Sequence, residues 1–288
     1  MDTITHTLFG LTIYKAINKE EMNKPMKHSL LFTAVIGSQI PDIDVVSKWW
    51  DQQGLYLMWH RGITHSVFLV PVWALLLTAV CYLIWKVKDK RIFYTGLLAV
   101  FIHNTSDIFN AWGTGYLEPF SNVRLTFGTI PIIDFVVWTI ILFGFILSRL
   151  RKYPTHQIFK GVGLLIAVHF LLQSAQGFYI YQNVKDQYEQ VALSADFVPW
   201  NFKVIGKRDQ QVEILGATSW GTPKMEIQLQ TAEETNLDYL FEENTRARTL
   251  YQWAPFVVVV KEQGRLGIYD PRFYRNGQSF LFEYIETH

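Results

Sequence analysis

Five groups of acidic and imidazole side chains stand at the ends of apolar segments, and these residue types can bind metal and move protons. They are Asp2 with His6, Asp42 with Asp44, His60 with His65, His103 with Asp107, and Asp134 alone. Neutral imidazole and carboxylate are the ligands of zinc, and carboxylate-rich sites also accept manganese or magnesium. The sequence therefore predicts a site for a divalent metal, with zinc as the first choice.

In two of these groups, Asp2/His6 and His103/Asp107, the second residue stands four positions after the first. Residues four apart lie on the same face of a helix, so each pair could bind one ion. The other two pairs need a bend in the chain. Pro41 directly precedes two carboxylates and favours an extended turn there, while Gly62 allows the backbone between His60 and His65 to fold back.

A catalytic metal lowers the pKa of its bound water toward about 7, and a carboxylate outside the ligand set can then serve as general base. Asp44 is our candidate for that base, although it could equally be a ligand. Arg61 follows His60 directly and could hold an anionic group such as a phosphate.

A simpler interpretation exists for each residue taken alone. An Asp or His at a helix end is more often a cap or a hydrogen-bonded surface group. Asp2 and Asp134 each stand where a helix is expected to begin. His169 lies four residues before Gln173 within an apolar run, which favours a buried hydrogen-bonded pair.

The elements that must position these groups are membrane helices. A span needs about 20 mostly apolar residues, and four segments are candidates: Val67–Trp85, Ile92–Phe109, Ile130–Leu147 and Ile158–Ile180. Two shorter runs, Ile4–Ile17 and Ser29–Ile40, are doubtful spans. The start of the chain has no basic region before an apolar stretch, so we expect no cleaved signal peptide.

The charges in the connecting loops orient these segments. Lysines and arginines gather at one set of ends, around residues 15–27, 86–91 and 149–152. The positive-inside rule places those ends in the cytoplasm. If all six segments cross, the nine acidic and imidazole groups share the extracytoplasmic face. Ionisable residues near membrane segments are costly and usually functional, which favours one common site.

After about Asp186 the composition changes to short alternating or β-branched segments, among them 211–215, 225–229 and 256–261, with glycines between them. This pattern predicts a second, mostly-β domain. We expect a helical membrane domain over residues 1–183 and a mostly-β extracytoplasmic domain over residues 184–288.

Composition excludes several classes of protein. The chain has 288 residues and a net charge of +1, so no basic surface predicts nucleic acid as a partner. Its single cysteine excludes an internal disulfide framework and a cysteine-cluster metal site. The mean hydropathy of +0.11 and the 50% hydrophobic content fit a chain that is partly membrane and partly water-soluble.

Four motifs together resemble a known family. M-D-x-x-T-H at the start, P-D-x-D, H-R-G-x-T-H-S and H-x-x-x-D are similar to those of the YdjM/YfhP-like membrane-bound metal-dependent hydrolases of the bacterial inner membrane, over roughly residues 1–180. That family looks distantly similar to zinc-dependent phospholipase C and the fungal zinc nucleases. The resemblance implies metal ligation by the residues that match the motifs: Asp2, His6, Asp42, Asp44, His60, His65, His103 and Asp107. Asp134 is added from its position alone.

The leading hypothesis is a metal-dependent hydrolase of a phosphoester or another ester, with membrane lipids or a small molecule as substrate. A non-catalytic scaffold is an alternative, in which the metal is structural and the β domain binds a protein partner. A cation transporter is a further alternative, but it would place polar residues at several depths of the membrane.

Overall fold

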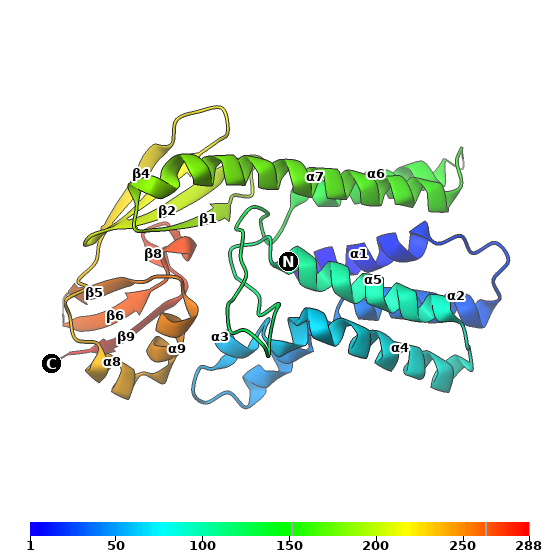
Figure 1. The fold of residues 1–288 in the computed structure, drawn as a ribbon, viewed down its shortest axis with the longest axis horizontal. Coiled ribbons are helices and arrows are strands. Elements are labelled where there is room, and N and C mark those ends of the chain that lie inside the picture. The colour runs from blue at the N-terminus through cyan, green and yellow to red at the C-terminus, as the bar shows by residue number, and fades with distance from the viewer. Residues whose placement is uncertain (151, 263, 288) are drawn as a thin grey trace. The chain divides into compact units, whose positions relative to one another are not determined.

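The N-terminal part of the chain, up to Val184, folds mostly into helices (Figure 1), and several of them begin at a capping side chain. Asp2, Asn23, Asp89 and Asp134 each accept hydrogen bonds from backbone N–H groups of the first turn that follows. The helices are α1 (Thr3–Ala16), α2 (Lys24–Gly37), α4 (Val70–Trp85), α5 (Lys90–Asp107), α6 (Phe135–Arg149) and α7 (Thr155–Val184). Shorter helical turns are η1 (Ile40–Trp49), α3 (Tyr56–Trp59), η2 (Ile63–His65) and η3 (Val67–Leu69).

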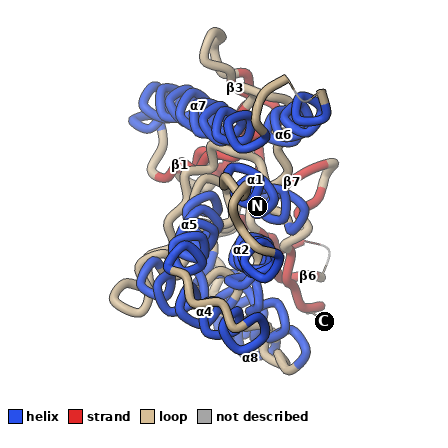
Figure 2. Tube along the Cα trace, turned by 90° about the vertical axis from the view of Figure 1, so that its right-hand side faces the viewer, coloured by secondary structure: helices blue, strands red, loops and turns tan. Residues whose placement is uncertain are grey.

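Helix α2 packs against α1, α4 and α5, as the end-on view of Figure 2 shows. Small residues allow these close approaches. A Cβ on Gly10 of α1 would lie 2.6 Å from the Ala34 carbonyl oxygen of α2, and a Cβ on Gly96 of α5 would lie 3.2 Å from the Ala74 Cα of α4. Packing through small residues is typical of helices in membranes, where lipid tails are as apolar as leucine.

Two described helical segments are long and apolar enough to cross a membrane, Val67–Trp85 and Thr155–Gln187. A third span results if the bent pair Lys24–Gly37 and Ile40–Trp49 counts as one. This is fewer than the four spans expected from sequence. Helix α6 has only 15 residues, which extend about 22 Å, and α5 ends in polar residues that lower its hydropathy.

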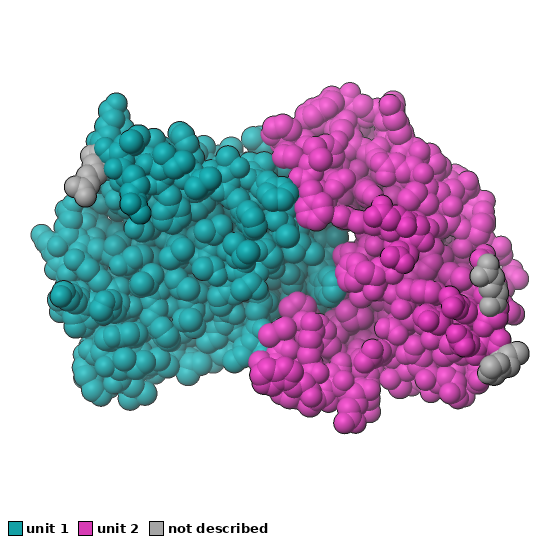
Figure 3. Space-filling model, turned by 180° about the vertical axis from the view of Figure 1, so that it is seen from behind, with its two compact units in different colours: residues 1–44, 61–174 teal, residues 45–60, 175–288 magenta. Residues whose placement is uncertain are grey.

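The structure describes residues 1–150, 152–262 and 264–287, which form two compact units (Figure 3). The first unit contains Met1–Asp44 and Arg61–Ser174, and the second contains Val45–His60 and Ala175–His288. The division lies within α7, before the domain boundary expected after residue 183. The grouping of Val45–His60 with the C-terminal part has no signal in the sequence.

The second unit contains antiparallel sheets, as the alternating patterns predicted. Strands β1 (Gln190–Ala195), β2 (Phe202–Arg208), β3 (Gln211–Ala217) and β4 (Lys224–Gln230) form one sheet in that order. A second sheet pairs β5 (Val258–Glu262), β6 (Arg265–Tyr269) and β9 (Phe282–Glu286), and β7 (Tyr274–Arg275) pairs with β8 (Gln278–Ser279). Helices α8 (Asp238–Glu243) and α9 (Thr245–Trp253) join the two sheets in sequence. The fold class, a helical membrane part with a β-rich part after it, is confirmed.

Successive residues of β2 are buried on opposite faces of the first sheet. Val204 packs with Ile180 and Val184 at the end of α7, whereas Ile205 packs with Val258 of the second sheet. Side chains that follow one another along a strand point to opposite faces, so this strand joins two hydrophobic cores.

We expect Gly10→Leu to separate α1 from α2, because its side chain would enter the backbone of Ala34 and Val35. Overpacking of this kind costs about 1–3 kcal/mol of unfolding free energy. The matched control is Gly161→Leu in α7, where an added Cβ meets no atom within 4 Å. Thermal unfolding in detergent should show a clear loss for the first variant only, and equal stabilities would contradict the close helix contact.

Candidate metal centre

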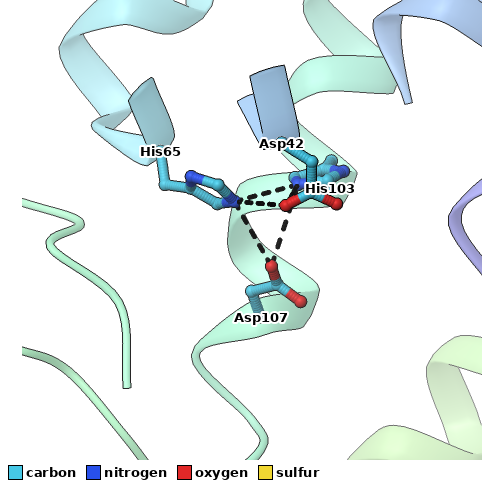
Figure 4. A group of neighbouring side chains, drawn as sticks. All are labelled: Asp42, His65, His103 and Asp107. Carbon is cyan, nitrogen blue, oxygen red and sulfur yellow. Dashed lines mark hydrogen bonds and ion pairs between the residues drawn. The ribbon is translucent and has the colours of Figure 1, made fainter. Parts of the chain in front are cut away.

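Four side chains from three separate elements point toward one another in the first unit (Figure 4). Asp42 comes from η1, His65 from η2, and His103 and Asp107 from the last turns of α5. One ligand atom of each lies within 4.8 Å of the others. These four residues could hold a metal ion.

The imidazole nitrogens and carboxylate oxygens of these four side chains lie close to one another, although each of these atoms can accept a proton. His65 Nε2 lies 3.1 Å from His103 Nε2, 3.2 Å from Asp42 Oδ1 and 3.5 Å from Asp107 Oδ2. His103 Nε2 lies 3.7 Å from each of the same two carboxylate oxygens. The His65, His103 and Asp107 side chains are fully buried.

The outer ring nitrogens have partners that fix the two imidazoles. His103 Nδ1 lies 2.8 Å from the Ser38 carbonyl oxygen, which can only accept a hydrogen bond. His65 Nδ1 lies 3.3 Å from Asp44 Oδ2 and 3.1 Å from the Thr64 hydroxyl. We therefore assign the protons of the neutral rings to Nδ1, which leaves both Nε2 lone pairs directed at the centre.

The centre consequently contains two imidazole lone pairs and two carboxylate oxygens with no proton between them. Asp42 Oδ1 and Asp107 Oδ2 accept no hydrogen bond from the described residues. Buried acceptors that face one another repel, and burial strengthens that repulsion because little solvent screens it. A divalent cation would convert these repulsions into four attractions, so the donor set fits a metal such as zinc.

His6 adjoins this group from α1. Its ring stacks on His103 with centroids 3.8 Å apart, and its Nε2 lies 3.3 Å from Asp107 Oδ1. Neither ring nitrogen of His6 has a hydrogen-bond partner among the described residues, although the side chain is fully buried. His6 is thus placed to contact whatever occupies the centre on the Asp107 side.

Arg61 holds Asp107 rather than facing an open cavity. Its Nε lies 3.3 Å from Asp107 Oδ2, while its two terminal nitrogens donate to Asn110 Oδ1 and to the Met1 carbonyl oxygen. The residue is buried and adopts a left-handed backbone with φ of 58°. A non-glycine residue in that conformation is strained, so these contacts must compensate for the strain.

The α-amino group of Met1 also contacts Asp107 through Oδ1. Burial, together with the nearby Arg61 guanidinium, holds the pKa of this amino group well below its ordinary value. Asp107 is therefore surrounded by donors on one side and by imidazoles on the other.

Asp44 accepts hydrogen bonds at Oδ2 from the Arg61 backbone N–H at 3.0 Å and from the Thr64 hydroxyl at 2.7 Å. The same oxygen faces His65 Nδ1. These bonds close the chain on itself between residues 44 and 61. They also make Asp44 a partner of the outer nitrogen of His65.

Besides His6 and Asp44, which adjoin it, three predicted residues lie outside the four-residue group. Asp2 caps α1, where Oδ1 accepts from the N–H groups of Ile4 and Thr5. Asp134 caps α6 and accepts from His169 Nε2 at 2.8 Å. His60 belongs to the second unit and stacks on Tyr56.

The partner of His169 is therefore Asp134. The sequence spacing had predicted Gln173, and that prediction is wrong. Gln173 instead donates to the Thr129 carbonyl oxygen at 3.0 Å. Sequence reasoning also missed Ser38, Thr64 and Asn110. Thr64 stands inside the H-R-G-x-T-H-S motif, which offered a signal, whereas a backbone carbonyl such as that of Ser38 offers none.

The group is not closed on all sides. The Asp42 side chain is 21% exposed, whereas those of His65, His103 and Asp107 are fully buried. Part of the Asp42 side chain therefore meets solvent, although the Oδ1 atom that faces the histidines is itself buried.

Comparison with known proteins identifies the family of the part of the chain that contains these four residues. The sequence matches the family of YdjM inner membrane proteins over residues 1–182. The chain belongs to the YdjM family. The resemblance expected from the motifs is thereby confirmed at the level of the family. Together with its apolar helices, this membership makes the chain a membrane protein.

One curated relative is YfhP of Bacillus subtilis (strain 168), itself described as an uncharacterized protein. It is 35% identical over 138 residues, which cover 46% of this chain and 42% of YfhP. The chain thus matches less than half of the length of that relative. No solved structure matches the chain.

Substitution of Asp42, which faces the histidines, and of Asp2, which caps α1, should have different effects on the metal content of the protein. We expect Asp42→Asn to lose most bound metal, because its Oδ1 faces both Nε2 atoms. Asp2→Asn should keep the metal, since asparagine caps a helix as well as aspartate does. Elemental analysis of both purified variants provides the comparison, and equal metal content in the two would contradict the assignment.

Proposed function

We propose that this chain is a membrane-embedded, metal-dependent hydrolase that cleaves a phosphoester or another ester, in a membrane lipid or a small molecule. The observation that supports it is the convergence of two imidazole lone pairs and two carboxylates at one buried point. Following the loop charges, we place this centre at the extracytoplasmic face. The β-rich unit would lie on the same side and is available to a protein partner.

Asp42, His65, His103 and Asp107 would hold the metal, most simply zinc, with manganese or magnesium as alternatives. When bound, a divalent ion supplies a Lewis acid for the ester oxygen and a water whose pKa falls toward about 7. All other roles belong to side chains of the protein.

Asp44 and the Ser38 carbonyl orient the two histidines through their Nδ1 atoms. Asp44 Oδ2 already accepts from a backbone N–H and a hydroxyl and faces His65 Nδ1, so this oxygen is directed at protein partners. We therefore assign Asp44 to positioning His65 in preference to proton transfer. His6, whose ring nitrogens have no hydrogen-bond partner among the described residues, is the better candidate to accept a proton.

Arg61 has a comparable positioning role. Its guanidinium donates to Asn110 and Met1 and faces Asp107, so it would hold that ligand ionised and in place. This arrangement supports a positioning role better than the binding of a substrate phosphate, because the group is buried among protein acceptors.

The exposure of Asp42 favours a hydrolase over a scaffold. A structural metal site is closed by four protein ligands, whereas a catalytic site keeps one position for water. With four candidate ligands here, a hydrolase would require either a fifth coordination position or the release of Asp42, the most exposed of the four. The partial exposure of the Asp42 side chain makes this ligand the nearest of the four to solvent. Helix α4, an apolar span, contains no Asp, Glu, Lys or Arg, so it offers no charged pathway for a cation transporter.

The full chain in mild detergent should contain near-stoichiometric metal and hydrolyse bis(p-nitrophenyl) phosphate or phospholipid vesicles. The double variant His65→Ala, His103→Ala should lose both properties, because it removes both nitrogens that face the centre. Chelator should abolish hydrolysis, and zinc or manganese should restore it in the natural protein only.

Two outcomes would refute different parts of this proposal. Folded protein that never binds metal above background would exclude the metal centre itself. Stoichiometric metal with no hydrolysis of any ester or phosphoester tested would exclude the hydrolase and support the scaffold.

Asp44→Asn tests the positioning role separately. Loss of an outer partner of a metal-bound histidine costs about 10–100-fold in metal affinity or activity. We expect a weaker metal affinity within that range in a competition titration with a chelator, and residual hydrolysis at saturating metal. Complete inactivity at full metal occupancy would instead identify Asp44 as the general base.

A further inference from the structure

A groove with a volume of about 840 Å³ runs along the first unit between α1, α5 and α7. Its walls are apolar over most of their length, with Ile13 on α1, Leu98 and Ile102 on α5, and Ile166 and Phe170 on α7. Figure 2 shows these three helices nearly end-on. None of the four residues of the candidate metal centre lines this groove.

The two ends of the groove differ in charge. Arg91 in the first turn of α5 and Lys160 in α7 line one end, whereas Thr105, Ser106 and Phe109 line the other. Between Arg91 and Asp107 the helix rises about 24 Å, which approaches the roughly 30 Å of a hydrocarbon layer. The groove is therefore a long apolar channel with a cationic end and a neutral end.

Further basic residues surround the cationic end. Lys86, Lys88 and Lys90 precede Arg91 in the chain, and Asp89 pairs with Arg91 at 2.7 Å. One carboxylate thus offsets one of these charges and leaves a net positive loop. Basic groups beside a membrane helix attract anionic lipid headgroups.

We infer that this groove binds an acyl chain of an anionic membrane phospholipid, with the lipid phosphate at the Arg91–Lys160 end. The apolar walls match the hydrocarbon chain, and the charge at one end determines its direction. The phosphate would lie about 24 Å from Asp107 along the helix, too far for hydrolysis at the metal centre. This lipid is consequently a bound ligand and not the substrate, so the inference does not rest on the proposed function.

Two glycines of α7 allow a direct test. An added Cβ on either Gly161 or Gly163 meets no atom within 4 Å, but only Gly163 lines the groove. Gly163→Phe should therefore fill the groove without a backbone clash, and Gly161→Phe should leave it open. Replacing glycine within a helix also removes a destabilising residue, which favours folding of both variants.

The experiment is native mass spectrometry of the full chain in mild detergent with added dioleoylphosphatidylglycerol or dioleoylphosphatidylcholine. We expect one tightly held lipid per chain, with a preference of about tenfold for the anionic lipid. Gly163→Phe should weaken its binding about tenfold or more, because the chain loses the apolar surface that it covers. Gly161→Phe should bind as the natural protein does. The pair Arg91→Gln, Lys160→Gln should bind both lipids alike.

Several results would overturn the inference. Equal retention in Gly163→Phe and Gly161→Phe would show that the lipid binds elsewhere. Equal affinity of the natural protein for both lipids would remove the role of the cationic end. A dimer that only Gly163→Phe disrupts would identify a second copy of the chain as the occupant. If Gly163→Phe does not fold, as judged by thermal unfolding, the Arg91→Gln, Lys160→Gln pair decides the question.

Discussion

Repulsion among four buried proton acceptors is the constraint on which the first unit depends. Two Nε2 atoms 3.1 Å apart, with two carboxylate oxygens within 4 Å, do not form a stable arrangement in a low-dielectric interior by themselves. The surrounding structure holds them there from outside. Ser38 and Asp44 fix the rings, and Arg61 fixes Asp107. The strained backbone of Arg61 indicates that contacts around the four-residue group hold this part of the fold in an unfavourable conformation.

The sequence motifs identified the chemistry better than the individual roles. Asp42, His65, His103 and Asp107 were all among the predicted ligands, and the structure brings them together. Asp2 and Asp134 carry the same functional group, yet each caps a helix. Spacing along the chain specifies which side chains share a local face, but it does not specify which distant elements meet. The capping role was one of the two interpretations that an aspartate at a helix start allows.

Other parts of the arrangement had no sequence signal because they depend on tertiary packing. His169 was expected to pair with Gln173 on the same helix, but the cap of α6 supplies a carboxylate at 2.8 Å. The Ser38 carbonyl acts through its backbone, which any residue could supply. The membrane spans were partly overcounted for a similar reason. Helix α5 is partly apolar, yet its last turns carry His103 and Asp107 of the four-residue group, which lowers its mean hydropathy.

The hydrogen bond from the Arg61 N–H to Asp44 closes the base of an excursion of the chain, Val45–His60, that belongs to the second unit. Asp42 stands just before this closure and His65 just after it. Two members of the four-residue group are therefore connected through a short local path, although sixteen residues of another unit separate them in sequence. The excursion is in effect an insertion between two residues, Asp44 and Arg61, that a hydrogen bond holds together. A change in the length of this excursion should leave Asp42 and His65 in place as long as the bond from the Arg61 N–H to Asp44 holds.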